Sequence, residues 1–227
     1  MLDVRRGEPD FQVRIVGEQY WWRVQFMPSG DRPGFETANE FRLPAGASVE
    51  LILDSADVIH SFWVPPLAGK VDMIPGRTNR LLVEPTRPGL YRGQCAEFCG
   101  LSHAYMSLLV EISNDAEFDA WRKHQTAVAA APADRQARRG QQLFLAAGCG
   151  GCHTIRGTAA TGTIGPDLTH FASRGTLGAV RLPNEPDHVA RWIADTDDVK
   201  SGTAMPAFGF LAEADLDALV AYLGGLE

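Results

Sequence analysis

The sequence changes its pattern near Thr126, and this change limits the chain to two domains of different class. Over residues 11–112, short runs rich in β-branched and aromatic residues alternate with Pro and Gly turns, which is typical of strands. Beyond Asp134 the apolar residues recur at helical spacing, as at Leu216, Leu219, Val220 and Leu223. Between the two patterns the residues are small, nearly uncharged and include a Pro, which is typical of a linker. We therefore predict a domain over residues 1–125, a linker over 126–134 and a second domain over 135–227.

The first domain is expected to be an all-β sandwich. Turn signals such as Ser29-Gly30 and Pro75-Gly76 separate the strands, which favours an antiparallel sandwich over alternating strands and helices. Asn114 can cap one short helix that closes the domain, with Phe118 and Trp121 on its apolar side. The strands are expected over residues 11–16, 20–26, 48–54, 58–64, 78–84, 89–94 and 106–112.

The second domain is expected to be small, all-α and rich in loops. Asp134 can cap a helix that runs through Leu145, and Asp187 can cap another that runs through Ala194. Glu213 begins a third helix. Gly- and Thr-rich loops lie between the first two helices.

Charge and hydropathy exclude several classes of protein. The 227 residues include 28 acidic and 21 basic side chains, a formal charge of −7, and 45% are hydrophobic. This is a globular composition, and it argues against nucleic acid as a partner because phosphate binding needs clustered Lys and Arg. The longest stretch without a formal charge, 140–155, has 16 residues, whereas a membrane-spanning helix needs roughly 20 apolar ones. The first residues also lack the apolar core of a secretory signal.

One stretch of 12 residues contains four potential metal ligands: Cys95, Cys99, His103 and Met106. His60 lies on the expected strand 58–64. Thiolate, imidazole and thioether form a soft ligand set that suits copper. One Cys with two His and a weak Met would make a mononuclear site, but a second Cys allows two thiolates to bridge two copper ions. Such a site moves electrons and binds no substrate.

Two other interpretations use the same residues. Cys95 and Cys99 could form a disulfide in an oxidising compartment. Together with His60 and His103 they could instead hold a structural zinc ion. Neither interpretation requires Met106, and Cys-x3-Cys is an unusual zinc spacing. We therefore favour copper.

This region resembles the CuA domain of subunit II of the haem-copper cytochrome c oxidases, a cupredoxin-type Greek-key sandwich. The resemblance covers about residues 17–121 and includes DVIHSFWVP, VDMIPGR and RPGLYRGQCAEFCGLSHAYM. It implies a dinuclear copper centre with Cys95 and Cys99 as bridges, His60 and His103 on one ion each, Met106 as a weak ligand and Glu97 through its backbone carbonyl.

The resemblance has two further consequences. The family uses the side chain of the residue that matches Glu97 for a magnesium ion shared with subunit I, so we expect magnesium only in the full complex. The aromatic run where the family's electrons enter from cytochrome c corresponds to Tyr20, Trp21 and Trp22. Its preceding His is Glu18 here and its first Trp is Tyr20, which argues against docking of an external cytochrome at Tyr20. The run could also be part of the sandwich core.

Cys149-Gly-Gly-Cys152-His153 is a Cys-x-x-Cys-His motif, the attachment signature of c-type haem. Both thiols add to the haem vinyl groups, and the adjacent His becomes the proximal iron ligand. A thioredoxin-like redox pair is the alternative, but it needs a strand-helix-strand context that is absent here. A zinc site would need a second Cys pair.

Met205, His170 and His188 lie downstream of His153 and could supply the sixth iron ligand. We expect Met205, because Met/His ligation raises the haem potential, as suits an acceptor that feeds an oxidase. The two histidines are expected to be solvated surface residues. The second domain also resembles class I cytochrome c over residues 134–226, which implies that the carbonyl of Pro166 holds His153.

Neither site has an evident general base, nucleophile or open metal position, so we expect a relay of electrons. The fusion resembles oxidases whose subunit II carries its own cytochrome c. This implies that electrons pass from an upstream respiratory donor to the haem, to the dinuclear copper and to subunit I, which reduces dioxygen. The chain itself would carry no dioxygen-reducing site.

Both cofactors are assembled on the outer, periplasmic face of the bacterial membrane, where we therefore expect the chain. We also expect it to be part of a longer subunit with an N-terminal membrane anchor. Two other functions stay open: the CuA subunit of a nitric oxide or nitrous oxide reductase, and a periplasmic metal-binding or metal-delivery protein. The second leaves the haem without a purpose.

Overall fold

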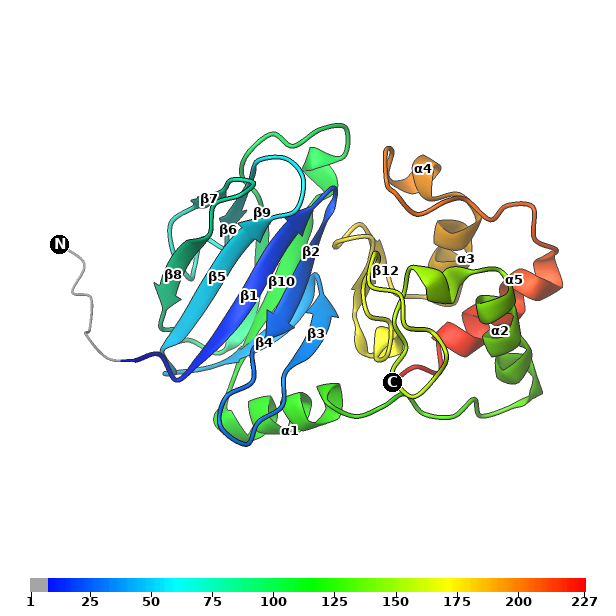
Figure 1. Cartoon of the computed structure of the whole chain (residues 1–227), viewed down its shortest axis with the longest axis horizontal. Helices are drawn as coiled ribbons and strands as arrows, with labels where there is room; N and C mark the ends of the chain where they lie inside the picture. Colours follow the sequence, from blue (N-terminus) through cyan, green and yellow to red (C-terminus); the bar gives the residue numbers. More distant parts are fainter. Residues whose placement is uncertain (1–7) are drawn as a thin grey trace.

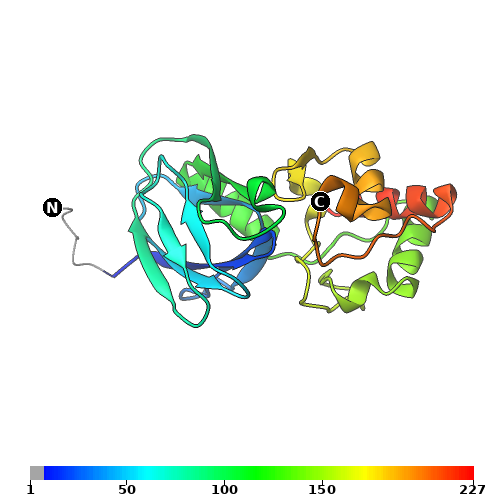
Figure 2. The same ribbon diagram turned by 90° about the horizontal axis from the view of Figure 1, so that it is seen from above.

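Two lobes lie side by side in the computed structural model, which describes residues 8–227 (Figures 1 and 2). The N-terminal lobe is a β-sandwich and the C-terminal lobe is mostly helical. This confirms the expected fold class. Every helix within the described residues is too short or too polar to cross a membrane.

The N-terminal lobe consists of two five-stranded sheets, with strand orders β3-β2-β1-β5-β8 and β4-β10-β9-β6-β7. The helix α1 (Asp115–Gln125) follows the last strand. The strands are β1 (Phe11–Glu18), β2 (Trp21–Phe26), β3 (Phe35–Ala38), β4 (Glu40–Pro44), β5 (Val49–Ser55), β6 (His60–Trp63), β7 (Val71–Met73), β8 (Asn79–Val83), β9 (Gly89–Cys95) and β10 (Ser107–Ser113).

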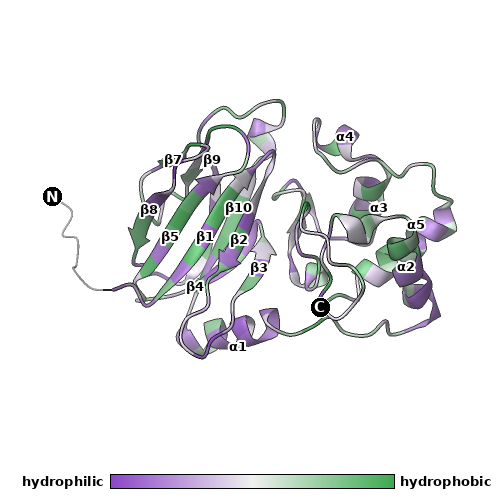
Figure 3. Cartoon of the chain, viewed as in Figure 1, coloured by the Kyte–Doolittle hydropathy of each residue, from purple (hydrophilic) through white to green (hydrophobic). Residues whose placement is uncertain are grey.

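The core of the sandwich follows from the alternation of side chains along each strand. On β1, Phe11, Val13 and Ile15 are buried while the intervening Gln12 and Arg14 are partly exposed. Figure 3 shows the same alternation of hydrophobic and hydrophilic residues on β1. Each buried aliphatic or aromatic side chain stabilises the fold by roughly 1.5–3 kcal/mol. The sheets are therefore joined by a continuous apolar layer.

The sequence favours an antiparallel sandwich, and two strand pairs of the structure depart from this. β1 pairs with β5 in parallel, and β4 pairs with β10 in parallel. Each pair joins strands that are far apart in the sequence. After β3 in the first sheet, the chain forms β4 in the second sheet and then β5 in the first sheet again. Turn signals report only the direction of neighbouring strands, so they could not predict these pairings. The sequence also did not predict β3, β4 and β7, which are only three to five residues long.

The C-terminal lobe contains four α-helices within the described residues: α2 (Arg135–Ala146), α3 (Pro186–Ala194), α4 (Thr196–Val199) and α5 (Glu213–Leu223). A small sheet joins β11 (Thr176–Leu177) to β12 (Leu182–Pro183). The side chain of Asp134 accepts a hydrogen bond from the backbone N–H of Ala137, so it caps α2 as predicted.

The predicted cap at Asp187 is wrong, because α3 begins two residues earlier than that cap implies. Glu185 is the N-cap residue, its side chain makes no capping bond, and Pro186 occupies the first turn. The fixed backbone angle of Pro suits this position, so it sets the start of the helix without a side-chain cap. The four-residue α4 was not predicted, since one turn shows no periodicity.

Candidate metal centre and haem site

The expected copper ligands converge at one end of the second sheet. β9 ends at Cys95, and β10 begins at Ser107, so the stretch between these antiparallel neighbours forms one loop. His60 is the first residue of β6, and this strand pairs with the end of β9 through Phe62 and Cys95. Both ends of the ligand loop are therefore held by strands.

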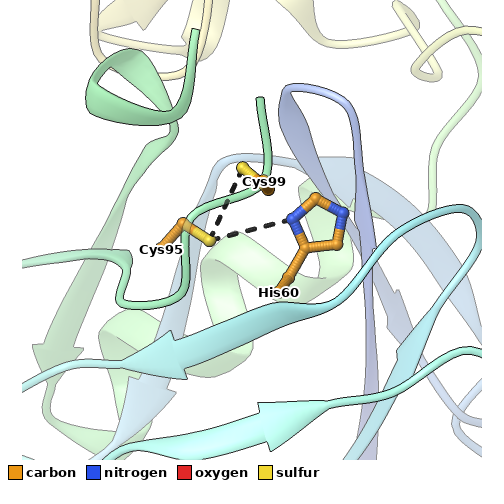
Figure 4. A group of neighbouring side chains, drawn as sticks. All are labelled: His60, Cys95 and Cys99. Carbon is orange, nitrogen blue, oxygen red and sulfur yellow. Dashed lines mark hydrogen bonds between the residues drawn. The ribbon is translucent and has the colours of Figure 1, made fainter. Parts of the chain in front are cut away.

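Two pairs of donor atoms lie at this loop, and His60 from β6 completes one of them. Cys95 Sγ lies 3.8 Å from Cys99 Sγ and 3.7 Å from His60 Nδ1 (Figure 4). On the other side, Cys99 Sγ lies 3.5 Å from His103 Nδ1 and 3.8 Å from Met106 Sδ. The sulfur–sulfur distance is nearly twice the roughly 2.05 Å of a disulfide bond, so the cysteines are not bonded. The backbone oxygen of Glu97 also lies 3.2 Å from Cys95 Sγ.

These distances fit soft metal ions. A divalent metal binds thiolate at about 2.3 Å and imidazole at about 2.0–2.1 Å, so one ion can link donors up to roughly 4.3 Å apart. The gaps from Cys95 to His60 and from Cys99 to His103, 3.7 and 3.5 Å, both meet this limit. Each imidazole faces a different sulfur. This arrangement suits two ions that share both sulfurs better than one zinc ion.

Two residues that the sequence analysis did not single out hold the ring of His60. His60 Nε2 donates to the carboxylate of Asp57 over 2.7 Å, and Asp57 also accepts from the backbone N–H of Gln19 over 2.6 Å. Gly17 leaves room for the ring, since a Cβ there would lie 2.8 Å from His60 Cδ2. The sequence does carry a signal for Asp57. Ligating imidazoles usually donate to a carboxylate or a carbonyl, and Asp57 is an acidic residue three positions before the expected ligand His60.

The protonation of these donors couples metal binding to the release of protons. Burial lowers the pKa of His60, but its hydrogen bonds with Asp57 and Cys95 outweigh burial and raise the pKa to about 9. Contact with Cys99 lowers the pKa of Cys95, and contact with Cys95 raises the pKa of Cys99. The first thiol thus ionises readily while the second resists. Since metal ligands must be deprotonated, loading the site should release protons.

The aromatic run lies beside this centre. Trp22 is fully buried in the core, and its ring meets Phe62 edge-on with the centroids 5.9 Å apart. Tyr20 is 5% exposed, and its hydroxyl accepts from the backbone N–H of Leu101. Trp21 lies under the guanidinium of Arg23, which is 4.7 Å from the ring centroid. Trp22 and Tyr20 therefore belong to the packed core of the sandwich. The sequence left this open as the alternative to a site of electron entry.

The Cys-x-x-Cys-His motif forms a tight turn directly after α2. Nδ1–H of His153 donates to the carbonyl of Pro166 over 2.8 Å, which leaves Nε2 for an iron ion. A Cβ on Gly165 would lie 2.6 Å from His153 Cε1, so Gly lets the backbone approach the ring this closely. Burial lowers the pKa of His153 and favours the neutral imidazole that binds iron. These residues fit a covalently attached haem.

The candidates for the sixth iron ligand differ in their surroundings. Met205 lies half-buried between α4 and α5, packed against the core of the lobe, and its carbonyl accepts from Thr196 Oγ1 over 2.7 Å. The expectation that His170 is solvated is wrong: it is 4% exposed, and its ring nitrogens face the carbonyls of Glu227 and Ala127 at 2.7 and 3.2 Å. His188 is half-buried beside Glu185. His170 would have to give up both of these hydrogen bonds to bind iron, whereas the side chain of Met205 packs among apolar residues.

Comparisons with known proteins agree on both lobes. Residues 9–113 match the family described as cytochrome c oxidase subunit II, periplasmic domain, and residues 137–227 match the cytochrome c family. The first family implies a CuA copper centre and the second a haem c, and the residues described above fit both groups.

Individual relatives match along the whole chain. Cytochrome c oxidase subunit 2 of Alkalihalophilus pseudofirmus is 36% identical over 226 residues, which are 99% of this chain and 64% of the relative. The same subunit of Bacillus sp. (strain PS3) is 32% identical over 238 residues, 100% of this chain and 65% of the relative. Among solved structures, the periplasmic domain of subunit II of cytochrome oxidase of Bradyrhizobium japonicum is 28% identical, covers 52% of this chain and 95% of its own, and has a TM-score of 0.49. The chain thus spans just under two thirds of these two subunits.

Proposed function

The chain belongs to the cytochrome c oxidase subunit II family and carries a cytochrome c domain, and on this premise we propose that it relays electrons from a haem c to a dinuclear copper centre. The observation that carries the proposal is the pairing of each sulfur with its own imidazole: His60 lies with both sulfurs in a buried cluster, and the partly buried His103 lies 3.5 Å from Cys99 Sγ. Bound copper and haem supply reversible one-electron oxidation and reduction. The ligands proposed for copper are His60, Cys95, Glu97, Cys99, His103 and Met106.

For the haem we propose Cys149 and Cys152 as the attachment residues, with His153 and Met205 on the iron. Pro166 acts through its carbonyl, which fixes the ring of His153 in one orientation. We also propose that the two domains divide within residues 126–134, after α1 and before α2.

The proposal extends to the partners and the location. Subunit I of the oxidase would take the electrons from the copper centre, an upstream respiratory carrier would supply them, and both steps would take place on the periplasmic face of the membrane. The oxidase subunits among the relatives support this over a nitric oxide or nitrous oxide reductase. A haem lobe in the same chain supports it over a metal-delivery protein.

Copper titration of the haem-loaded, copper-free chain tests the proposal. We expect two copper ions per chain, visible charge-transfer bands and a near-infrared band. After rapid reduction of the haem, these bands should bleach as the haem reoxidises. A colourless chain that binds one zinc ion, or a haem that stays reduced while the copper bands persist, would refute the relay. Cys99→Ser should abolish the near-infrared band and leave the haem bands intact.

A further inference from the structure

Lys200 lies buried where the two lobes meet. It is one of three lysines in the chain and is 2% exposed, whereas lysine is almost never fully buried without a partner. Its amino group donates to the carbonyl of Gly178 over 2.8 Å within its own lobe. It also donates across the interface to the carbonyl of Tyr20 over 2.5 Å. Lys200 thus links the haem lobe to the residue that replaces the family's electron-accepting Trp.

The residues next to Lys200 lie on the loop that contains the copper ligands. Ser102, which stands between Cys99 and His103 in the sequence, donates from Oγ to the carbonyl of Ser201 over 2.7 Å. A Cβ on Gly202 would lie 3.4 Å from a methyl carbon of Leu101, so this backbone is in close contact with the loop. Residues 200–202 therefore rest directly on the ligand loop.

The same segment leads to the expected axial ligand of the haem. Met205 follows three residues after Gly202, and its carbonyl accepts from Thr196 at the start of α4. Lys200 directly follows α4. The stretch from α4 to Met205, here called the Met205 loop, is therefore fixed at its centre to the copper lobe.

Other contacts between the lobes leave the Met205 loop free. Arg23 Nη2 donates to the carbonyls of Thr163 and Ile164 over 3.0 and 3.2 Å. The carboxylate of Glu40 accepts from the backbone N–H groups of Gly175 and Thr176 over 2.9 and 2.8 Å. These contacts orient the haem lobe through other segments. Among the described residues, Lys200 and Ser201 make the hydrogen bonds that join the Met205 loop to the copper lobe.

Building on the function proposed above, we propose that Lys200 is a positioning residue for electron transfer between the two centres. Its buried amino group holds the Met205 loop against Tyr20 and the copper-ligand loop. The rate of electron transfer through protein falls steeply as the distance between the two centres grows. A fixed contact keeps this distance short and constant, whereas a mobile lobe would sample many distances. The electron then crosses without a preceding docking motion.

The test uses the full chain loaded with haem and copper. Lys200→Met keeps the length of the side chain and removes its hydrogen-bond donors, Lys200→Arg keeps them, and Lys123→Met changes an exposed lysine on α1 as the control. The haem is reduced by a light pulse, and the bleaching of the copper bands is followed in solutions of increasing viscosity. Optical spectra and potentials of both centres are recorded for each variant.

We expect wild type and Lys123→Met to transfer electrons at one rate that does not depend on viscosity. Lys200→Met should be about tenfold slower, because the loss of both hydrogen bonds of this buried amino group lowers the population of the docked loop by about this factor. Its rate should also fall with viscosity, while spectra and potentials stay unchanged. Lys200→Arg should recover part of the rate. A change confined to folding would not create a dependence on viscosity.

Lys200→Met with the wild-type rate and no viscosity dependence would overturn the positioning role and leave the relay intact. Absence of any haem-to-copper transfer in wild type would instead refute the relay itself. If Lys200→Met does not retain both centres, Ser102→Ala decides the matter, because it removes the other hydrogen bond between the Met205 loop and the copper-ligand loop. Its transfer should be slower than in wild type and should slow further as viscosity rises. A wild-type rate without viscosity dependence in Ser102→Ala would overturn the proposal.

Discussion

Gly17 lies beside the ring of His60, and the lack of a side chain there decides where this expected copper ligand can sit. In Gly17→Ala the new methyl group would lie 2.8 Å from His60 Cδ2, so the ring has to move. We expect weaker copper binding and altered copper bands, with unchanged haem bands, in an optical titration. Gly69→Ala is the matched control, because a Cβ there meets no atom within 4 Å. Wild-type copper bands in Gly17→Ala would show that the ring has another place to go.

Asp57 contacts the expected copper site through the ring of His60. Its hydrogen bonds with His60, Gln19 and Val58 prevail over burial and lower the pKa of its carboxyl group. Asp57→Asn keeps the shape but removes the charge that orients the imidazole, so copper affinity should fall about 10–100-fold. Competition with a chelator of known affinity measures this loss. Asp72→Asn, an exposed carboxylate, should leave the affinity unchanged, and an equal loss there would point to net charge as the cause.

The expected ligands could be predicted because their spacing is short and soft donors are rare in this sequence. Cys95, Cys99, His103 and Met106 share one loop, so their proximity needs no knowledge of the fold. The burial of His170 could not be predicted in this way. Its partners Ala127 and Glu227 are 43 and 57 residues distant, and only the folded lobe brings them together.

At the scale of elements, the crossing of α2 and α5 depends on one glycine. A Cβ on Gly140 would lie 1.9 Å from the carbonyl oxygen of Ala218 on α5. Overpacking typically costs about 1–3 kcal/mol, and a clash with backbone belongs at the upper end because backbone cannot rotate away. Gly140→Ala should therefore lower the thermal midpoint of the haem lobe, measured by circular dichroism. Gly225→Ala, whose Cβ would lie 3.5 Å from the nearest atom, should unfold at the wild-type midpoint.

Elements with local signals were predicted better than elements defined by distant partners. The capping box of Asn114 and Glu117 begins α1 where the sequence predicted it. The cap at Asp134 also begins α2 as expected. In contrast, the short β4 exists because it pairs with β10, whose residues lie more than 60 positions later. No property of residues 40–44 alone distinguishes such a strand from a loop.

At the scale of the whole molecule, the sequence predicted two domains and a linker but not the contacts between them. The linker region is held against the haem lobe, since Ala129 N donates to Arg156 O over 3.0 Å. The guanidinium of Arg156 donates in turn to the carbonyl of Gln125 at the end of α1. Such contacts use backbone groups, which every residue carries, so composition cannot reveal them.

Burial of Lys200 gives the docked molecule a defined dependence on pH. Burial lowers the pKa of Lys200 to about 7, with a smaller lowering by Arg181 and an opposing effect of Cys99. Once the lobes separate, the pKa returns to roughly 10.4. Between these values the separated state binds more protons, so the docked state gains stability as pH rises from about 7 to 10. The neutral amine still donates to both carbonyls.

Thermal unfolding of wild type and Lys200→Met at several pH values measures this effect. The difference between the two midpoints should grow in favour of wild type from pH 7 to about 9.5. Groups other than Lys200 titrate equally in both proteins and cancel in the difference. A difference that stays constant over this range would mean that Lys200 is buried in its charged form, because a charged amine titrates only above about pH 10.

The position of Tyr20 under Lys200 has a consequence for competition. A soluble electron carrier that approaches Tyr20 has to displace the contacts that Lys200, Ser102, Arg23 and Glu40 form between the lobes. The carrier can therefore bind only when the two lobes have separated. Its apparent affinity is its intrinsic affinity multiplied by the fraction of time that the lobes are apart. The covalently attached lobe thus acts as a resident competitive inhibitor of foreign carriers, and substitutions that weaken the interface would admit them.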